Sequence, residues 1–504
     1  MNHLNRSFNF VALLSLFLFC AALVLPVNSA LQTKIPDTPA GKKLAGFLVA
    51  VESGDAQKMR EYAESFTSSF LDKIPVEKHV SFFQQVHQNC EGFDVVQIEE
   101  DSDYELSAIL KCKNSAGYRF FAVRTEAKPP YAVVDMSFGM AEAPGPPAEA
   151  LPPPTASEAA DSNAVVKGKL GIAVDMHVLR KMREGFSGAV LIARNGEKII
   201  HKGYGWAVRD RKLPVTTKTV FDIGSISKPF TATAVMKLEQ QKKLKVTDPI
   251  TRFFDNVPDD KKSITVHHLL THSAGLGEYH DTKGDFEEMT REEAIQHIFN
   301  QKLKFKPGMD NAYSNSGFTL LAVIVEKVSG QPFKTFLKKE IFEPAGMTST
   351  GFYRNPAWTK ENDVHGYNAR KLGKENSPLT WPEITWALLG NGGIVSSAED
   401  LFKFHQALQG NTILFQKTKK KSYTGHVKIG EDAMMGYGWG IRSTEHGKRV
   451  SHGGANDFGF QAMFIRYLDE DVVIIITTNA GHVGNIRNLQ SEIDSLVFDK
   501  NQSD

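Results

Sequence analysis

The chain contains 504 residues, of which 41% are hydrophobic and 23% are charged. This composition is typical of a globular protein that is long enough to form two or more domains. The formal net charge at pH 7 is only +1, so neither nucleic acid nor an anionic surface is expected as a partner.

The first thirty residues predict an export signal. Arg6 supplies a basic start, residues 11–25 form an apolar stretch, and Ser29 and Ala30 give a small-residue end that is compatible with cleavage after Ala30. If the segment is retained, it serves instead as a membrane anchor. In either case the rest of the chain is expected to be exported, to a periplasm or out of the cell, and no other membrane span is expected.

The cysteines fit an oxidising compartment. Once residues 1–30 are removed, the chain keeps two of them, Cys90 and Cys112. An even pair is most simply a disulfide in such a compartment, although two separate buried thiols would also fit the sequence. No histidine lies beside them at ligand spacing, so no zinc site is expected there.

Residues 31–140 predict a small α+β domain. Helical patterns fill residues 40–89, and strand-like runs follow at residues 94–98, 104–111, 118–124 and 131–138. The outline resembles the cone-shaped NTF2-like domains. Because the polar residues form no catalytic constellation, this domain is expected to be a binding or spacing module.

A proline-rich linker at residues 141–164 leads to a second domain at residues 165–504. Asn195-Gly196 predicts a hairpin near the start of this domain. The strands predicted at its two ends cover residues 188–193, 198–203, 437–442, 458–467 and 471–478. Since the sequence between them is mostly helical, the simplest fold is α+β: an antiparallel sheet built from both ends of the domain, flanked by helices, with an inserted helical subdomain.

Ser225 and Lys228 form the first candidate chemical motif. Residues 231–238 carry a helical pattern, and Pro229 is tolerated only in the first turn of a helix, which puts Ser225 at the helix N-terminus. Lys228 shares a face with the Ser225 hydroxyl and can take its proton if burial lowers the lysine pKa. The alternative is a helix cap beside a solvated lysine.

Two later stretches add polar residues at the edges of predicted elements. Tyr313 and Asn315 lie on a turn at the start of a helix. His452, Gly453 and Gly454 precede a predicted strand, and the two glycines allow a ligand to approach the backbone closely.

With these motifs in this order, residues from about 165 to 500 resemble the serine β-lactamase and penicillin-binding-protein superfamily. The branch that fits best contains class C β-lactamases, D-alanyl-D-alanine carboxypeptidases, D-aminopeptidases and related esterases. The S-x-x-K motif of the superfamily matches Ser225 and Lys228, its Y-x-N motif matches Tyr313 and Asn315, and its K-T-G or H-x-G element matches residues 452–454. The glycine-punctuated residues 269–276 and 392–401 resemble accompanying structural motifs.

The resemblance implies a role for each matched residue. Ser225 would be acylated, and Lys228 and Tyr313 would activate it and relay its proton to the leaving group, with the identity of the general base left open. Asn315 would hold Lys228 and the amide or ester of the substrate. The backbone N–H groups of Ser225 and Ala455 would form the oxyanion hole, and neither a metal nor an organic cofactor is implied.

One departure from the family pattern bears on the substrate. His452 and Gly453 stand where K-T-G has a lysine and a threonine, which together suit a substrate carboxylate. The absence of this lysine and threonine favours an esterase or a hydrolase of D-amino-acid amides or peptides. The expected partner is therefore a small-molecule ester, amide or D-amino-acid-containing peptide. The alternatives are a D-alanyl-D-alanine carboxypeptidase or β-lactamase, and a penicillin-binding sensor or scaffold without turnover. His452 itself has a second reading, as a structural histidine at a strand end.

Two other patterns predict structure rather than chemistry. His268 and His272 have the i,i+4 spacing of metal ligands, but no glutamate follows His268 as a zinc protease would require, so structural roles are expected. The lysine-rich residues 417–421 predict a solvated surface loop.

Overall fold

The computed structural model describes residues 34–499 with gaps at 73, 102, 116, 142–153, 156–160, 368–375 and 482–485. The predicted export signal at residues 1–30 and most of the predicted linker lie outside the described residues. Among the residues that are described, no helix is both long and apolar enough to cross a bilayer.

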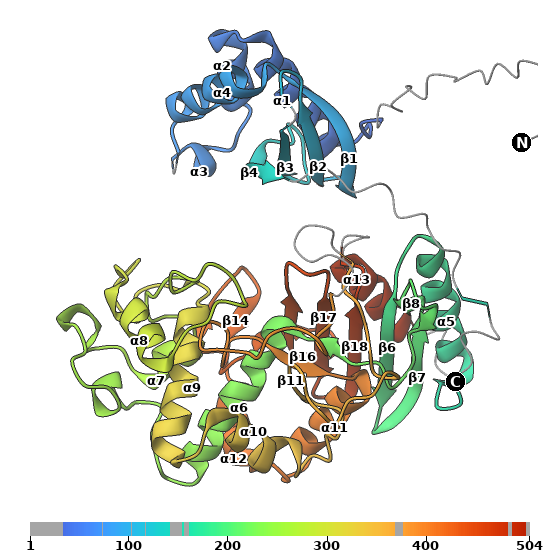
Figure 1. Ribbon diagram of the computed structural model, residues 1–504, viewed down its shortest axis with the longest axis vertical. Coiled ribbons are helices and arrows are strands. Elements are labelled where there is room, and N and C mark those ends of the chain that lie inside the picture. Colours follow the sequence, from blue (N-terminus) through green and yellow to red (C-terminus); the bar gives the residue numbers. More distant parts are fainter. Residues whose placement is uncertain are drawn as a thin grey trace, which may run out of the picture.

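The N-terminal part consists of helices followed by a four-stranded antiparallel sheet in the order β1-β2-β3-β4 (Figure 1). The helices are α1 (Pro39–Ser53), α2 (Ala56–Glu64), α3 (Ser68–Leu71) and α4 (Val76–Cys90), and the strands are β1 (Phe93–Asp101), β2 (Glu105–Cys112), β3 (Tyr118–Thr125) and β4 (Val133–Ala141). Helix α1 begins where the Thr38 side chain accepts a hydrogen bond from Gly41 N, and it ends at Gly54 in the left-handed conformation.

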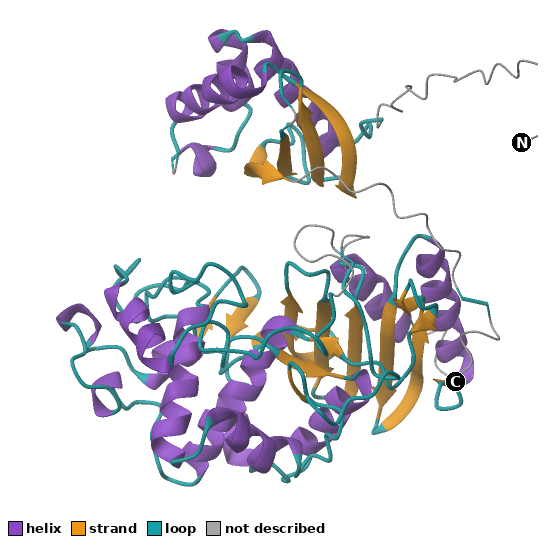
Figure 2. Cartoon of the chain, viewed as in Figure 1, coloured by secondary structure: helices purple, strands orange, loops and turns teal. Residues whose placement is uncertain are grey.

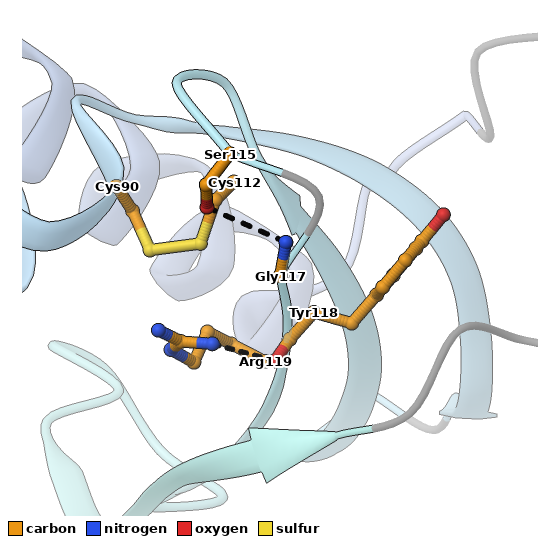
Figure 3. Close-up of a disulfide and its surroundings, with 6 residues drawn as sticks. All are labelled: Cys90, Cys112, Ser115, Gly117, Tyr118 and Arg119. Carbon is orange, nitrogen blue, oxygen red and sulfur yellow. Dashed lines mark hydrogen bonds between the residues drawn. A yellow bond between two sulfur atoms is a disulfide. The ribbon is translucent and has the colours of Figure 1, made fainter.

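Aromatic side chains fill the space between these helices and their sheet. Phe47 on α1 is fully buried and packs against the rings of Phe83 and Phe121. A disulfide joins Cys90 at the end of α4 to Cys112 at the end of β2, so it links the last helix to the sheet (Figure 3).

The C-terminal part is built on a nine-stranded antiparallel sheet in the order β13-β14-β15-β16-β17-β18-β6-β7-β5. The strands are β5 (Val165–Val166), β6 (Gly188–Arg194), β7 (Glu197–Tyr204), β13 (Val427–Lys428), β14 (Ala433–Met435), β15 (Gly440–Thr444), β16 (Gly447–Ala455), β17 (Gln461–Tyr467) and β18 (Val472–Thr478). Strands β6 and β18, from opposite ends of the domain, are neighbours in the register Val472 to Arg194 through Thr478 to Gly188.

Both faces of this sheet are covered. Along β18, Ile474 and Ile476 pack with α5 (Gly168–Arg183) and α13 (Ile486–Val497), whereas the alternating Val473 and Ile475 belong to the larger core on the other face. Helix α11 (Ala398–Gln409) packs on that second face. Burial on both faces explains why β18 has a continuous apolar sequence.

The remaining elements are the helical insertion beside the sheet (Figure 2) and short strands that form two small sheets, β10-β12-β11 and β8-β9. The helices are α6 (Ser227–Gln240), α7 (Val266–Leu270), α8 (Arg291–Asn300), α9 (Asn315–Ser329), α10 (Phe333–Leu337) and α12 (Gln416–Ser422), with single turns η1 (Gly224–Ile226), η2 (Ile250–Arg252), η3 (Asp259–Lys261) and η4 (Lys338–Phe342). The short strands are β8 (Trp206–Val208), β9 (Leu213–Pro214), β10 (Phe221–Asp222), β11 (Gly351–Phe352) and β12 (Ile394–Ser396).

The predicted fold class is confirmed, with two local corrections. Residues 451–455 precede strand β17 as predicted, but they are also strand themselves, because they form the end of β16, which pairs with both β15 and β17. The lysine-rich residues 417–421 are not a loop but lie in α12, where Lys419 is buried and its Nζ donates to the carbonyl oxygens of Gln409 and Gly410. The Lys419 amine thus satisfies carbonyl oxygens at the C-terminal end of α11. This lysine is therefore part of the packed structure and not of a solvated segment.

Candidate active site

Ser225 lies in a single helical turn between strand β10 and helix α6. The preceding Gly224 has φ 49°, in the left-handed region that favours glycine. A Cβ atom at this position would stand 2.7 Å from the backbone nitrogen of Ala455 on β16. Glycine is therefore required here both by the turn and by the close approach of the strand.

Lys228 lies one turn further along, on the face of α6 that points back to Ser225. Its Nζ is 3.0 Å from Ser225 Oγ and donates to the carbonyl oxygen of Asn391 at 2.8 Å. The side chain is fully buried, and this burial lowers the pKa of Lys228 well below its usual value, with a smaller opposing effect from the charges of Glu278 and Asp285. The amine is thus placed to act as a base toward the serine hydroxyl.

Tyr313 closes the other side of the amine. Lys228 Nζ lies 4.8 Å from the centre of the Tyr313 ring, and the same ring packs against His272 at 4.6 Å. Although Tyr313 is 38% exposed, desolvation of its hydroxyl raises the pKa of the phenol, while a hydrogen bond with Ser225 acts in the opposite direction. The phenol is therefore neutral at pH 7 and carries a proton that it can donate.

Asn315 begins helix α9, next to Tyr313. Its backbone N–H donates to the carbonyl oxygen of Glu278 at 2.8 Å, and its Oδ1 is buried with no hydrogen-bond partner in the described part of the chain. The expected contact between Asn315 and Lys228 is not present. The carbonyl oxygen of Asn391 binds the lysine instead.

Asn391 is the functional residue that sequence reasoning missed. Its side chain is buried and Nδ2 donates to Thr319 Oγ1 on α9 at 2.9 Å, which fixes the backbone that binds Lys228. The only signal in the sequence was the glycine pair that follows it. Every residue type has a backbone carbonyl oxygen, so the sequence pattern alone could not identify this contact.

The third motif lies on β16, against the serine turn. A Cβ atom on Gly454 would stand 2.0 Å from Ile223 O and 3.0 Å from Ser225 N, so the strand and the turn touch through their backbones. This contact brings the segments that carry the Ser225 and Ala455 amides together, as an oxyanion hole requires.

His452 is the side chain of that motif nearest the amine. Burial lowers the pKa of His452 to about 4, and the positive charge of Lys228 acts in the same direction. Its Nδ1 is hydrogen-bonded to the carbonyl oxygen of Gly453 at 2.7 Å. The imidazole is therefore neutral at pH 7 and gives the site no fixed cation.

The two histidines with metal-ligand spacing serve local structure. His268 Nδ1 accepts a hydrogen bond from Thr265 N, which completes the cap of α7, and buried His272 Nδ1 accepts from Ser314 N in the turn that carries Tyr313. Within the described ranges, no group of three or more His, Cys, Asp or Glu residues could hold a metal ion.

A cavity opens over these groups. Ser225, Tyr313, Asn315 and residues 451–457 line it, and so do several charged side chains. The charged residues of the wall in this part of the chain are Asp222, Glu278, Lys283, Asp285, Glu287, Arg442, Asp457 and Arg487. The carboxylates of Glu278 and Asp285 raise the pKa of the buried amine, against the larger effect of its burial.

The C-terminal part of the chain is similar to known proteins. A model of the Beta-lactamase family matches residues 176–493. The putative penicillin-binding protein PbpX of Bacillus subtilis is 33% identical over 315 residues, covering 62% of this chain and 75% of the relative. The octameric penicillin-binding protein homologue from Pyrococcus abyssi is 26% identical with a TM-score of 0.56, covering 64% of this chain and 76% of that one. The D-amino acid amidase from Ochrobactrum anthropi, complexed with D-phenylalanine, shares the fold at 22% identity and a TM-score of 0.57, covering 66% of this chain and 99% of that one. The chain belongs to the β-lactamase family, whose members include penicillin-binding proteins.

Proposed function

We propose that the protein is an exported serine hydrolase that forms an acyl-enzyme on Ser225 and cleaves esters or D-amino-acid amides and peptides. The observation that carries this proposal is the fully buried Lys228 amine, whose pKa is lowered and whose Nζ lies 3.0 Å from Ser225 Oγ. Burying an amine beside a serine hydroxyl costs free energy of folding. A catalytic role, in which the amine accepts the proton of the serine nucleophile, accounts for this burial.

The proposed acylation step uses groups from four residues. Lys228 Nζ takes the proton of Ser225 Oγ, and the oxygen attacks the carbonyl carbon of the substrate. The oxyanion accepts hydrogen bonds from the N–H groups of Ser225 and Ala455. As the tetrahedral intermediate collapses, Tyr313 donates its proton to the leaving alkoxide or amine and recovers a proton from Lys228. Water then attacks the ester of Ser225 by the reverse relay, which releases the acid and the free serine.

The charges around the cavity support a substrate without a carboxylate beside the reacting carbonyl. His452 is neutral at pH 7 and Gly453 has no hydroxyl. Neither residue therefore provides the hydrogen bonds to a substrate carboxylate that the lysine and threonine of K-T-G would provide. Glu278 and Asp285 place negative charge near Lys228. A substrate with a free amino group, such as an amino-acid amide or a short peptide, is complementary to this field.

A second candidate is hydrolysis of penicillins or D-alanyl-D-alanine peptides. Arg442 on β15 lines the same cavity and offers a cation that could pair with a carboxylate. However, Arg442 lies on β15 and not at the position that K-T-G gives to its lysine, where neutral His452 stands instead, so the first candidate is preferred.

Intact-mass analysis after incubation with a fluorophosphonate tests the proposal. We expect one adduct on the wild-type protein, none on Ser225→Ala, and an adduct on Ser451→Ala, a matched control because Ser451 lines the same cavity. Hydrolysis of p-nitrophenyl acetate and of a D-amino-acid p-nitroanilide should fall at least about a thousandfold in Ser225→Ala only. An adduct that persists on Ser225→Ala would show that another residue is the nucleophile.

A further inference from the structure

Asp222 is a buried carboxylate directly before the serine turn, and neither the motifs nor the proposed mechanism uses it. Its side chain is 2% exposed, and both oxygens are engaged: Oδ1 accepts from Gly224 N at 2.7 Å and Oδ2 accepts from the Tyr353 hydroxyl at 2.6 Å. None of the ion pairs in the described part of the chain includes Asp222. Burial without a cation disfavours the charged carboxylate and raises the pKa of Asp222, so the two hydrogen bonds are what hold this side chain in place.

The two partners of Asp222 come from opposite sides of a small sheet. Strands β10 and β11 both pair with β12, and Asp222 and Gly351 share the register position of Val395. Tyr353 directly follows β11, so its hydroxyl reaches across β12 to the carboxylate. Its ring is buried and packs at 4.9 Å against Trp381, which fixes the direction of the hydroxyl.

The first contact of Asp222 is a common local feature, whereas the second is not. A side-chain oxygen that accepts the N–H two residues on forms an Asx turn, and Asn or Ser at an exposed turn can do the same. The bond from Tyr353 joins residues 131 positions apart and restrains the carboxylate from a second element. Asp222 and Tyr353 also line the same cavity as Ser225.

We propose that Asp222, held by Tyr353, is a positioning residue that fixes the Gly224–Ser225 turn for reaction. The inference rests on the proposed function of Ser225. Gly224 occupies a left-handed conformation with direct backbone contact to Ala455, so its orientation sets both the direction of Ser225 Oγ toward Lys228 and that of the Ser225 N–H toward the oxyanion. Loss of this restraint leaves the groups present but misplaced, which lowers the rate of acylation rather than the affinity for substrate.

Three variants and a matched control test the positioning role. Tyr353→Phe removes only the second contact, Asp222→Ala removes both, and Asp222→Asn keeps an oxygen for Gly224 N while its amide can donate to Tyr353. The control is Tyr204→Phe, because Tyr204 at the end of strand β7 is also buried and its hydroxyl donates to a carboxylate, Asp175 Oδ1 on helix α5, at 2.8 Å.

The readouts are kcat and KM for p-nitrophenyl acetate and the rate of fluorophosphonate labelling. We expect kcat and the labelling rate to fall about tenfold in Tyr353→Phe and about a hundredfold in Asp222→Ala, with KM within twofold of wild type. Asp222→Asn should recover to within about tenfold of wild type, and Tyr204→Phe should stay within twofold.

Two results would overturn the positioning role. One is a Tyr353→Phe variant that labels as fast as wild type, which remains informative even if Asp222→Ala does not fold. The other is an equal loss in Tyr204→Phe, which would mean that any lost buried tyrosine bond slows the enzyme. If wild-type protein labels normally, either result leaves the proposed function intact. If the wild type itself is not labelled at Ser225, the proposed function fails and the positioning role fails with it.

Discussion

Restoring the lysine and threonine of the third motif should change the substrate preference of this enzyme. We predict that the double change His452→Lys, Gly453→Thr shifts hydrolysis toward substrates that carry a carboxylate. The backbone permits the change, because Gly453 lies in strand β16 outside the left-handed region. A Cβ atom there would meet the side chain of Met463, with Sδ at 3.1 Å, and this flexible thioether can move aside.

The charge state of the introduced amine follows from its surroundings. Burial and the neighbouring Lys228 lower the pKa of His452 from 6.5 to about 4. The same burial would lower the pKa of a lysine at this position, but lysine starts from a reference pKa near 10.4 and not 6.5, so the introduced amine keeps its proton to a higher pH than His452 does. One charge-assisted hydrogen bond to a carboxylate contributes about 1.5–3 kcal/mol, which corresponds to a roughly 10- to 150-fold change in selectivity.

The assay compares kcat/KM for benzylpenicillin with kcat/KM for p-nitrophenyl acetate in the double variant and in each single variant. The ratio should rise at least about tenfold in the double variant and less in either single one. An unchanged ratio with both activities retained would refute the reasoning about the carboxylate. Wild-type protein that hydrolyses the penicillin faster than the ester would also refute it, and Arg442→Ala would then test whether Arg442 holds the carboxylate.

Three further predictions concern titration and covalent structure. Because burial lowers the pKa of Lys228 well below 10.5, kcat/KM should rise with pH as the amine loses its proton and should reach its plateau well below about pH 10. A rise that continues to about pH 10 would contradict this. Burial raises the pKa of Asp222 from 3.8 to about 7, so between these pH values the folded protein binds a proton that the unfolded chain has released. The free energy of unfolding should therefore fall by up to about 4 kcal/mol between pH 4 and pH 7. Urea unfolding measured across this pH range should show the Asp222 contribution in wild type and not in Asp222→Asn. Thiol titration of the denatured, unreduced mature protein should find no free thiol, and Cys90→Ser, Cys112→Ser should lower the stability of the N-terminal part by about 3 kcal/mol, as expected for a crosslink across 22 residues; two reactive thiols in the wild type would contradict the pairing.

The parts of the site that lie close together in sequence were the parts that sequence could predict. Ser225 and Lys228 are three residues apart on a helix, so their spacing alone brings the two side chains together. Strand β18 was equally predictable, because burial on both faces demands an unbroken apolar run.

The contacts that sequence did not predict depend on tertiary structure. The lysine is held by the carbonyl of Asn391, 163 residues away, and a carbonyl is common to every residue type. Strand β16 reads Gly-Lys-Arg-Val-Ser-His-Gly-Gly-Ala, a polar and glycine-rich segment with little strand propensity, and it is a strand because it pairs on both sides with β15 and β17. Tertiary pairing overrides local preference in such a segment.

The adjacency of β6 and β18 has a consequence for how the domain folds. These two strands pair residue by residue although Arg194 and Val472 are separated by most of the domain sequence. Closing such a long loop costs conformational entropy before the contacts between the two strands form. Folding of this domain should therefore be slow compared with that of helical proteins, whose contacts are mostly local in sequence. A growing chain cannot complete its central sheet until residues 472–478 have been synthesised. Strands β6 and β7, which are synthesised first, therefore keep an unpaired edge until β18 is made. A chain that ends before Val472 lacks a central strand of the sheet rather than an edge strand.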